Sequence, residues 1–124
     1  MNTDIIQNFR TAIADFHVNK NDTFKQTVQF TDENSQPIDL SVYTFAKMQL
    51  KENENSESIL QFTSTGITHY INLSGSTVGI ISIGCTVPLS IPAFAYRYDL
   101  QFNNTTVYET ISKGKFKVVQ DITT

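Results

Sequence analysis

The sequence of 124 residues contains no tryptophan and a single cysteine, Cys85. One cysteine cannot form a disulfide within the chain, which is typical of a reducing compartment or of an assembly without cross-links. No apolar run approaches the roughly 20 residues of a membrane-spanning helix. Residues 1–4 also lack the basic and then apolar order of a secretory signal. We therefore expect a chain made in the cytoplasm that leaves the cell only by lysis or as part of a particle.

Positive charge is also scarce. The nine lysines and arginines are scattered along the chain and are outnumbered by twelve acidic residues, which gives a net charge of −3. A protein with this balance has no general attraction for phosphate backbones or for anionic lipids. We expect neither nucleic acid nor a membrane surface as a partner.

The histidines do not form a ligand set in the sequence. His17 and His69 are far apart and have no carboxylate or cysteine at ligand spacing, whereas a structural metal site needs about four ligands. His69 falls in the same alternation as Ile67 and Ile71. This favours a hydrogen-bonded inward residue near a sheet end.

Cys85 and the carboxylates likewise lack a catalytic arrangement. Cys85 alternates with Ile81 and Ile83, which favours a small core residue over a nucleophile that would need a base beside it. No pair of acidic residues has a spacing that implies acid and base catalysis. Residues 32–35 lack the ligand pattern of an EF-hand, and no glycine-rich phosphate loop is present. We expect no catalytic residues, no metal and no cofactor, and hence a protein that is not an enzyme.

The sequence is rich in period-two alternation of apolar and polar residues. Tyr96, Tyr98, Leu100 and Phe102 alternate with polar residues, so a strand places all four on one face. Comparable segments lie at residues 24–30, 44–51, 60–63, 67–73, 78–85, 107–111 and 116–119. Seven to nine short strands at this spacing predict an all-β fold, an antiparallel immunoglobulin-like β-sandwich, with a small barrel as the alternative.

Two segments interrupt this alternation. Residues 52–58 contain no apolar side chain and predict a mobile loop. Residues 89–91 are bracketed by Pro88 and Pro92, neither of which can donate a ladder hydrogen bond. This segment is predicted to cross from one sheet to the other.

The one helical pattern lies near the N-terminus, in residues 3–16. Its apolar residues recur at helical spacing, and Thr3 is placed to cap the helix. A helix this short is marginal in water unless its apolar side is covered. We therefore predict a short N-terminal helix or arm at residues 1–13 and a β-sandwich domain at residues 14–124. The arm either covers its own domain or docks on a neighbour as a helix or as an added strand.

The tyrosines divide into two groups. Tyr96 and Tyr98 are expected in the core with their hydroxyls at the sheet edge, where one of them can serve as the tyrosine corner of an immunoglobulin-like sandwich. Tyr70 and Tyr108 fall out of phase with the apolar residues of their own strands. The candidate interface residues are therefore Ile5, Ile6, Phe9 and Ile13 of the arm, together with Tyr70 and Tyr108.

Four runs of sequence carry a family resemblance. They are residues 23–30 (TFKQTVQF), residues 37–41 (PIDLS) followed by Tyr43 and Thr44, residues 96–100 (YRYDL) and residues 113–119 (KGKFKVV). Together they resemble the small β-sandwich modules of tailed bacteriophages, most closely the N-terminal domain of phage baseplate upper proteins. The likeness spans about residues 14–123 and rests on patterns that build a sandwich.

Members of such families are non-enzymatic parts of the virion, so the resemblance implies a structural subunit of a tail, baseplate, neck or capsid. The partners it implies are other virion proteins, with the chain present as a homo-oligomer or in multiple copies. A carbohydrate- or host-surface-binding module is the alternative. Such a module is expected to show clustered exposed aromatic residues, and the loops at residues 53–58 and 74–77 have none.

Overall fold

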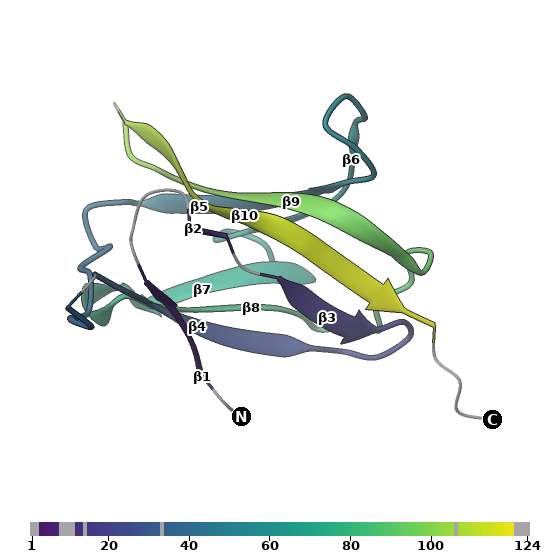
Figure 1. The fold of residues 1–124 in the computed structure, drawn as a ribbon, viewed down its shortest axis with the longest axis horizontal. Helices are drawn as coiled ribbons and strands as arrows, with labels where there is room; N and C mark the ends of the chain where they lie inside the picture. The colour runs from purple at the N-terminus through teal and green to yellow at the C-terminus, as the bar shows by residue number, and fades with distance from the viewer. Residues whose placement is uncertain (1–2, 8–11, 14, 33, 106, 121–124) are drawn as a thin grey trace.

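The computed structural model describes residues 3–7, 12–13, 15–32, 34–105 and 107–120 (Figure 1). This part of the chain forms ten strands and one short 3-10 helix. They are β1 (Thr3–Gln7), β2 (Ala12–Ile13), β3 (Phe16–Asn19), β4 (Lys25–Thr31), β5 (Phe45–Lys51), β6 (Ser58–Thr63), β7 (His69–Gly75), η1 (Ser76–Val78), β8 (Ile80–Cys85), β9 (Phe94–Asn103) and β10 (Tyr108–Val119).

The strands form one continuous sheet in the order β1-β4-β8-β7-β6-β5-β9-β10-β2, and β3 also pairs with β10. The sheet curls on itself, so that β4, β7 and β8 lie in one layer and β5, β9 and β10 in the layer above (Figure 1). The predicted all-β class is confirmed. The sheet is mixed, however, and not antiparallel as expected. The N-terminal strands add to β4 and β10 in the parallel direction, and β6 meets β7 in parallel through one pair, Thr63 and Tyr70.

The helix predicted for residues 3–16 is wrong in the part that the structure describes. Residues 3–7 pair with residues 27–31 of β4, and residues 12–13 pair with residues 112–113 of β10. An edge strand presents unpaired N–H and C=O groups, and a segment that pairs with it satisfies its own backbone at the same time. A short helix gains no such partners and is marginal in water. The tertiary structure therefore overrides the helical spacing of the apolar residues.

The core lies between the two layers of the curled sheet. Tyr96, Tyr98, Leu100 and Phe102 are each at most 2% exposed, as the alternation of β9 predicts. Cys85 is 5% exposed and lies in the same core cluster, which confirms its assignment as a core residue. Burying a large apolar side chain contributes about 1.5–3 kcal/mol relative to exposure. These residues therefore hold the layers together.

A β-bulge in β10 places two consecutive residues on the inner face. The register between β9 and β10 shifts between Thr110 and Ser112, so both Ile111 and Ser112 are buried. A bulge inserts one extra residue into a strand and redirects its side chains. As a result, the Ser112 Oγ lies 2.9 Å from the Tyr98 hydroxyl in the buried interior.

The segment that carries the two prolines connects β8 in one layer to β9 in the other (Figure 1), as predicted. Leu89 anchors it: the Leu89 side chain is 1% exposed, its N–H donates to the Asp22 carbonyl (2.9 Å), and its carbonyl accepts from the Asn21 N–H (2.7 Å). The Tyr96 hydroxyl donates to the Pro92 carbonyl at 2.6 Å. The crossing is thus fixed by both apolar burial and backbone hydrogen bonds.

Candidate functional site

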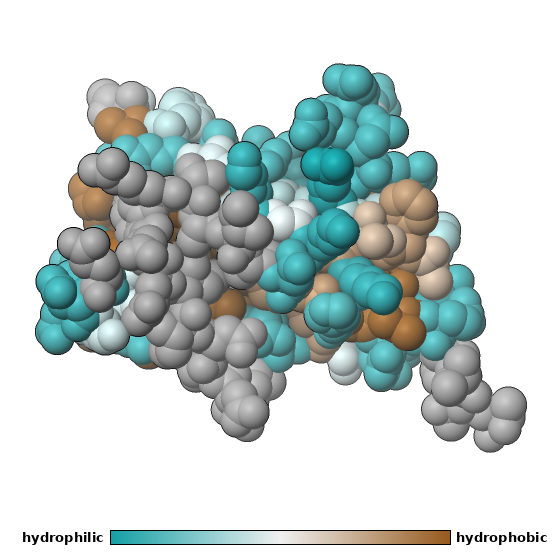
Figure 2. Space-filling model, in the orientation of Figure 1, coloured by the Kyte–Doolittle hydropathy of each residue, from teal (hydrophilic) through white to brown (hydrophobic). Residues whose placement is uncertain are grey.

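A polar groove of about 550 Å³ lies on the outer face of β5, β9 and β10. Most of its lining comes from outward positions of these strands, and the inward-facing Tyr98 and Gly114 contribute at its floor. The strand residues that line it are Gln49, Lys51, Arg97, Tyr98, Asp99, Lys113, Gly114 and Lys115. Asp15 and two residues of the loop after β5, Asn53 and Glu54, complete the lining. Figure 2 shows hydrophilic side chains gathered over this part of the surface.

Four cations line the groove, and three of them lie opposite one another on neighbouring strands. Arg97 of β9 is the cross-strand partner of Lys51 in β5 and of Lys115 in β10. Side chains opposite one another on neighbouring strands are about 5 Å apart at Cβ, and like charges in such pairs destabilise the sheet. Lys113 lies two residues from Lys115 on the same face of β10. We call these four residues, Lys51, Arg97, Lys113 and Lys115, the cationic row.

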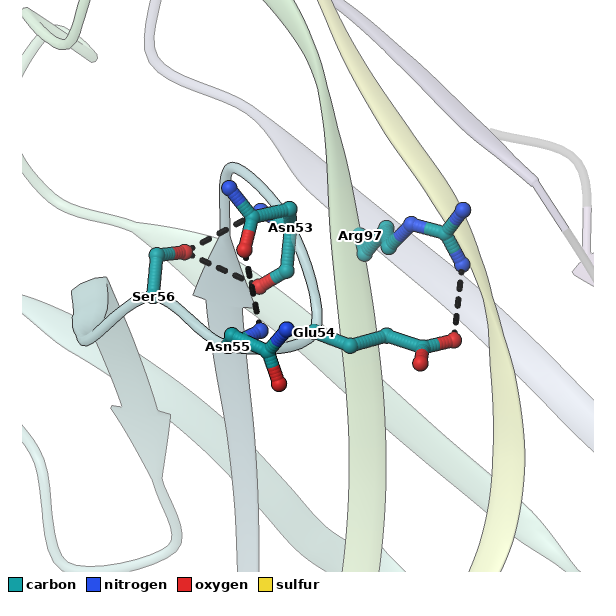
Figure 3. Close-up of polar contacts among 5 residues, drawn as sticks. All are labelled: Asn53, Glu54, Asn55, Ser56 and Arg97. Atoms are coloured by element: carbon teal, nitrogen blue, oxygen red, sulfur yellow. Dashed lines mark hydrogen bonds and ion pairs between the residues drawn. The ribbon is translucent and has the colours of Figure 1, made fainter.

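Asn53 and Glu54 bring the loop after β5 to the groove, and polar contacts within this loop are drawn in Figure 3. The Asn53 N–H donates to the Ser56 Oγ (3.0 Å), which donates back to the Asn53 carbonyl (2.9 Å). The Asn55 N–H donates to the Asn53 Oδ1 at 2.9 Å. The loop expected at residues 52–58 is present at residues 52–57, because Ser58 begins β6. Its turn is closed by its own side chains, and its mobility remains a prediction.

One ion pair joins this loop to the cationic row. The Arg97 Nη1 lies 3.2 Å from the Glu54 Oε1 (Figure 3), and the two side chains are 61% and 80% exposed. Exposed pairs of this kind contribute about 0–1 kcal/mol. Within the described ranges, Lys51, Lys113 and Lys115 make no ion pair. Asp99 is the cross-strand partner of Lys113, and Asp15 and Asp99 line the same groove, so carboxylates lie among the cations of the row.

Asp15 and Tyr98 line the groove, and each makes a hydrogen bond within the chain. The Asp15 carboxylate accepts the Lys115 N–H at 2.9 Å, which ties the segment before β3 to β10. Burial raises the pKa of Tyr98 to about 12; the nearby Asp15 charge acts in the same direction, and the hydrogen bond with Ser112 acts against it. The Tyr98 hydroxyl therefore stays protonated at neutral pH.

The predicted interface residues do not come together with the groove. Ile5 and Ile6 lie in β1 and Ile13 lies in β2, whereas Phe9 falls outside the described residues. Tyr70 is half-buried, and its hydroxyl lies 2.7 Å from where a Cβ on Gly84 would stand. Its role as an interface residue remains a prediction.

Tyr108 is 68% exposed beside the turn between β9 and β10. Exposed Val42 and Val107 lie close to that turn. Asn104 connects them, because its Nδ2 donates to the Val42 carbonyl (3.5 Å) and its Oδ1 accepts the Val107 N–H (2.9 Å). This exposed apolar patch is compatible with the interface prediction for Tyr108, which remains a prediction.

The histidines lie on different strands, His17 in β3 and His69 in β7. His69 is half-buried near the start of its strand, but it packs edge-on against Phe62 (5.5 Å between ring centroids) in place of the expected hydrogen bond. Burial lowers the pKa of His69 below its usual 6.5. Among the residues described, no three His, Cys, Asp or Glu side chains lie together as metal ligands.

The cationic row was missed in the sequence, where its members appear as scattered charges. The available signal was the position of Lys113 and Lys115 on alternate residues beside buried Phe116. Adding Lys51 and Arg97 requires the register of three strands, which the sequence does not supply.

No family model matches the sequence, and no curated protein matches it either. Within the described residues, no helix is long and apolar enough to cross a membrane.

Proposed function

We propose that this chain is a non-enzymatic structural component of a phage particle, a tail, baseplate, neck or capsid-associated subunit that assembles through protein–protein contacts. It is made in the host cytoplasm and resides in the virion, in several copies and in contact with other virion proteins. The resemblance of four sequence runs to phage β-sandwich modules supports this proposal, and so does one observation on the fold, the placement of β1 and β2.

The N-terminal strands β1 and β2 lie at the two ends of the strand order in the sheet. β1 covers the edge of β4, and β2 covers the edge of β10. Residues 3–7 contribute five cross-strand positions, and residues 12–13 contribute two. An edge strand of this kind is a template for a strand from another chain, because backbone hydrogen bonds provide affinity without a specific side chain. The same segment is therefore suited to pair with a neighbouring subunit.

We also propose that the curled sheet is a variant of the immunoglobulin-like sandwich. The contact that supports this is the hydrogen bond from the Tyr96 hydroxyl to the Pro92 carbonyl, four residues upstream. Tyr96 lies near the start of β9, just after the chain has crossed between layers. A tyrosine corner has this arrangement.

The test of the assembly role is removal of residues 1–13. We expect the truncated chain to remain folded, because the buried core that the structure describes is built from Phe16 and later residues, but to be absent from purified particles. Imaging of whole particles then locates the wild-type chain. Normal incorporation of the truncated chain would refute an assembly role for the N-terminal segment.

A finer version of this test uses two proline variants, Ile5→Pro and Ile6→Pro. In a strand that pairs on one side only, the N–H groups of consecutive residues point alternately toward and away from the partner. One of the two prolines therefore removes a hydrogen bond of the β1–β4 ladder, and the other serves as its matched control. Unequal incorporation of the two variants supports strand pairing as the mode of assembly.

The alternative, a carbohydrate- or host-surface-binding module, has less support. The groove on β5, β9 and β10 is large enough for a sugar, but the aromatic ring in its lining, that of Tyr98, is 2% exposed. Sugar-binding sites usually present an open aromatic face. Binding of a glycan by the isolated chain, measured by calorimetry, would favour this alternative.

A further inference from the structure

The N-terminal strands are attached to the sheet in two different ways. β2 and β3 pair with β10, whereas β1 pairs with β4 at the other end of the strand order. Phe16 and Val18 of β3 are 5% and 7% exposed and belong to the core, and the core that the structure describes contains no residue before Phe16. β3 is therefore anchored by buried side chains, and the attachment that the structure describes for β1 is its five backbone pairs with β4.

The chain has to turn back between these two attachments. From β4 to β10 the sheet has five antiparallel contacts and one parallel contact, that of β6 with β7, so β4 and β10 run in opposite directions. Because β1 is parallel to β4 and β2 is parallel to β10, β1 and β2 also run in opposite directions.

The connection between β1 and β2 is short for this change of direction. Four residues, 8–11, separate Gln7 from Ala12. β1 lies in the lower layer with β4, and β2 lies in the upper layer with β10 (Figure 1). Packed layers of sheet are about 10 Å apart. A short connection that must both turn back and cross between layers favours exchange of the strand with another copy, where the chain can run on without turning back.

We propose that copies of this chain exchange β1, so that residues 3–7 of one copy pair with β4 of a second copy. The register is the one found within the chain, with Thr3 opposite Thr27 and Gln7 opposite Thr31. β2 and β3 stay on β10 of their own copy. The occupant is a second copy because β1 is the strand that fits this edge, and every copy carries one. The inference rests on the proposed assembly role and names the partner and the edge that the N-terminal segment uses.

The balance between retained and exchanged β1 depends on concentration. Both states make the same backbone pairs, so they differ in the connection to β2 and in the number of copies involved. A segment tethered by a short linker has an effective concentration on the order of 1 mM at its own edge. We therefore expect retained β1 to dominate in dilute solution, and exchange to compete where copies are crowded, as in subunits that lie side by side in a particle.

Disulfide trapping between two singly substituted chains tests the exchange. One chain carries Ile5→Cys and the other carries Gln29→Cys, at positions that pair in the register of β1 and β4. Neighbouring strands lie about 4.8 Å apart, within the range of about 4.4–6.8 Å between Cα atoms that a disulfide requires. A bond between residues 5 and 29 in the mixture joins two different chains. We expect mild oxidation to give a cross-linked dimer, with this bond identified by peptide mass spectrometry.

A mixture of Ile6→Cys with Gln29→Cys is the matched control. Successive residues of a strand lie on opposite faces of the sheet, so residue 6 does not meet residue 29 in this register. Both mixtures lose the same hydrogen bond, from the Gln29 side chain to the Val78 carbonyl. The wild-type chain, whose single cysteine Cys85 is buried, gives the background. The bond between residues 5 and 29 should form at least about tenfold more than that between residues 6 and 29, and equal yields overturn the proposal.

A chain that carries both Ile5→Cys and Gln29→Cys measures the competition between the two states. Retained β1 gives a cross-linked monomer, and exchanged β1 gives a cross-linked dimer. The ratio of dimer to monomer should rise about tenfold for a tenfold rise in chain concentration. A ratio that does not depend on concentration overturns the proposal.

A second pair keeps the test decisive if a substituted chain fails to fold, which circular dichroism detects. Thr3→Cys with Thr27→Cys pairs in the same register, two residues away along both strands. This mixture should also give a bond between chains, and its absence would overturn the proposal.

Incorporation into particles is scored separately. A bond between residues 5 and 29 of different chains, together with absence of the wild-type chain from particles, would overturn the proposed function and keep the exchange. Particles that contain the wild-type chain and exclude the chain without residues 1–13, with no such bond between chains, would overturn the exchange and keep the proposed function.

Discussion

The buried hydroxyl pair Tyr98 and Ser112 permits a quantitative prediction. Both residues are at most 2% exposed, and their oxygens lie 2.9 Å apart. Tyr98→Phe removes one hydroxyl and takes this partner from the buried Ser112 hydroxyl. An unmade buried hydrogen bond costs about 1–3 kcal/mol, and both groups are neutral, so we expect a loss of about 2 kcal/mol in the free energy of unfolding.

The expected change in melting temperature follows from chain length. An unfolding entropy of about 2.1 cal/mol/K per residue over 124 residues gives about 0.26 kcal/mol/K. Tyr98→Phe should therefore lower the melting temperature by about 8 °C. Ser112→Ala should also destabilise the chain. The double variant should lose about 1 kcal/mol less of the free energy of unfolding than the two single variants lose together. Thermal and urea unfolding followed by circular dichroism measure all three variants.

The same pair gives a signal at alkaline pH. The pKa of Tyr98 is raised from 10.0 to about 12, so the folded state holds this proton more tightly than the unfolded state. Its contribution to stability is complete below pH 10 and is lost as the pH rises toward 12. The pKa of Tyr43 is also raised to about 12, first by burial and then by Glu109, so the informative quantity is the difference between wild type and Tyr98→Phe. Additive energies in the double variant would refute the reasoning, and so would a stability difference between wild type and Tyr98→Phe that stays the same as the pH rises from neutral toward 12.

Three further outcomes follow from single positions. Among the residues that the structure describes, the buried Thr31 hydroxyl has no hydrogen-bond partner, so Thr31→Val should stabilise the chain by about 1 kcal/mol in urea unfolding, and a loss of stability would contradict this. A Cβ at position 84 would lie 2.5 Å from the Phe24 carbonyl and 2.7 Å from the Tyr70 hydroxyl, so Gly84→Ala should destabilise by about 1–3 kcal/mol. A melting temperature at or above that of wild type would count against that packing. The pKa of His69 is lowered by burial, so its contribution to stability is present above about pH 6.5 and is lost as the pH falls below that value. His69→Gln should therefore weaken the loss of stability on acidification, and an unchanged pH profile would show that this burial has no consequence.

The alternation of apolar and polar residues along single strands predicted much of the fold. The inward positions of β9, the core placement of Cys85, the loop after β5 and the crossing at the prolines all follow from period-two burial and turn chemistry. These features depend on neighbours within a few residues. The helical pattern near the N-terminus failed for the opposite reason, since β1 and β2 are specified by the open edges of β4 and β10, which lie far away along the chain.

The sequence by itself determined that this is a β-rich chain with inward tyrosines in β9, because burial on a pleated strand follows directly from the order of residues. Only the tertiary structure decided that the sheet is mixed and curled, that a bulge turns Ser112 inward, and that four scattered cations meet in one groove. The physical reason is register: a strand fixes which of its own residues share a face, but the partner strand and its offset are chosen by packing and hydrogen bonding across the whole sheet.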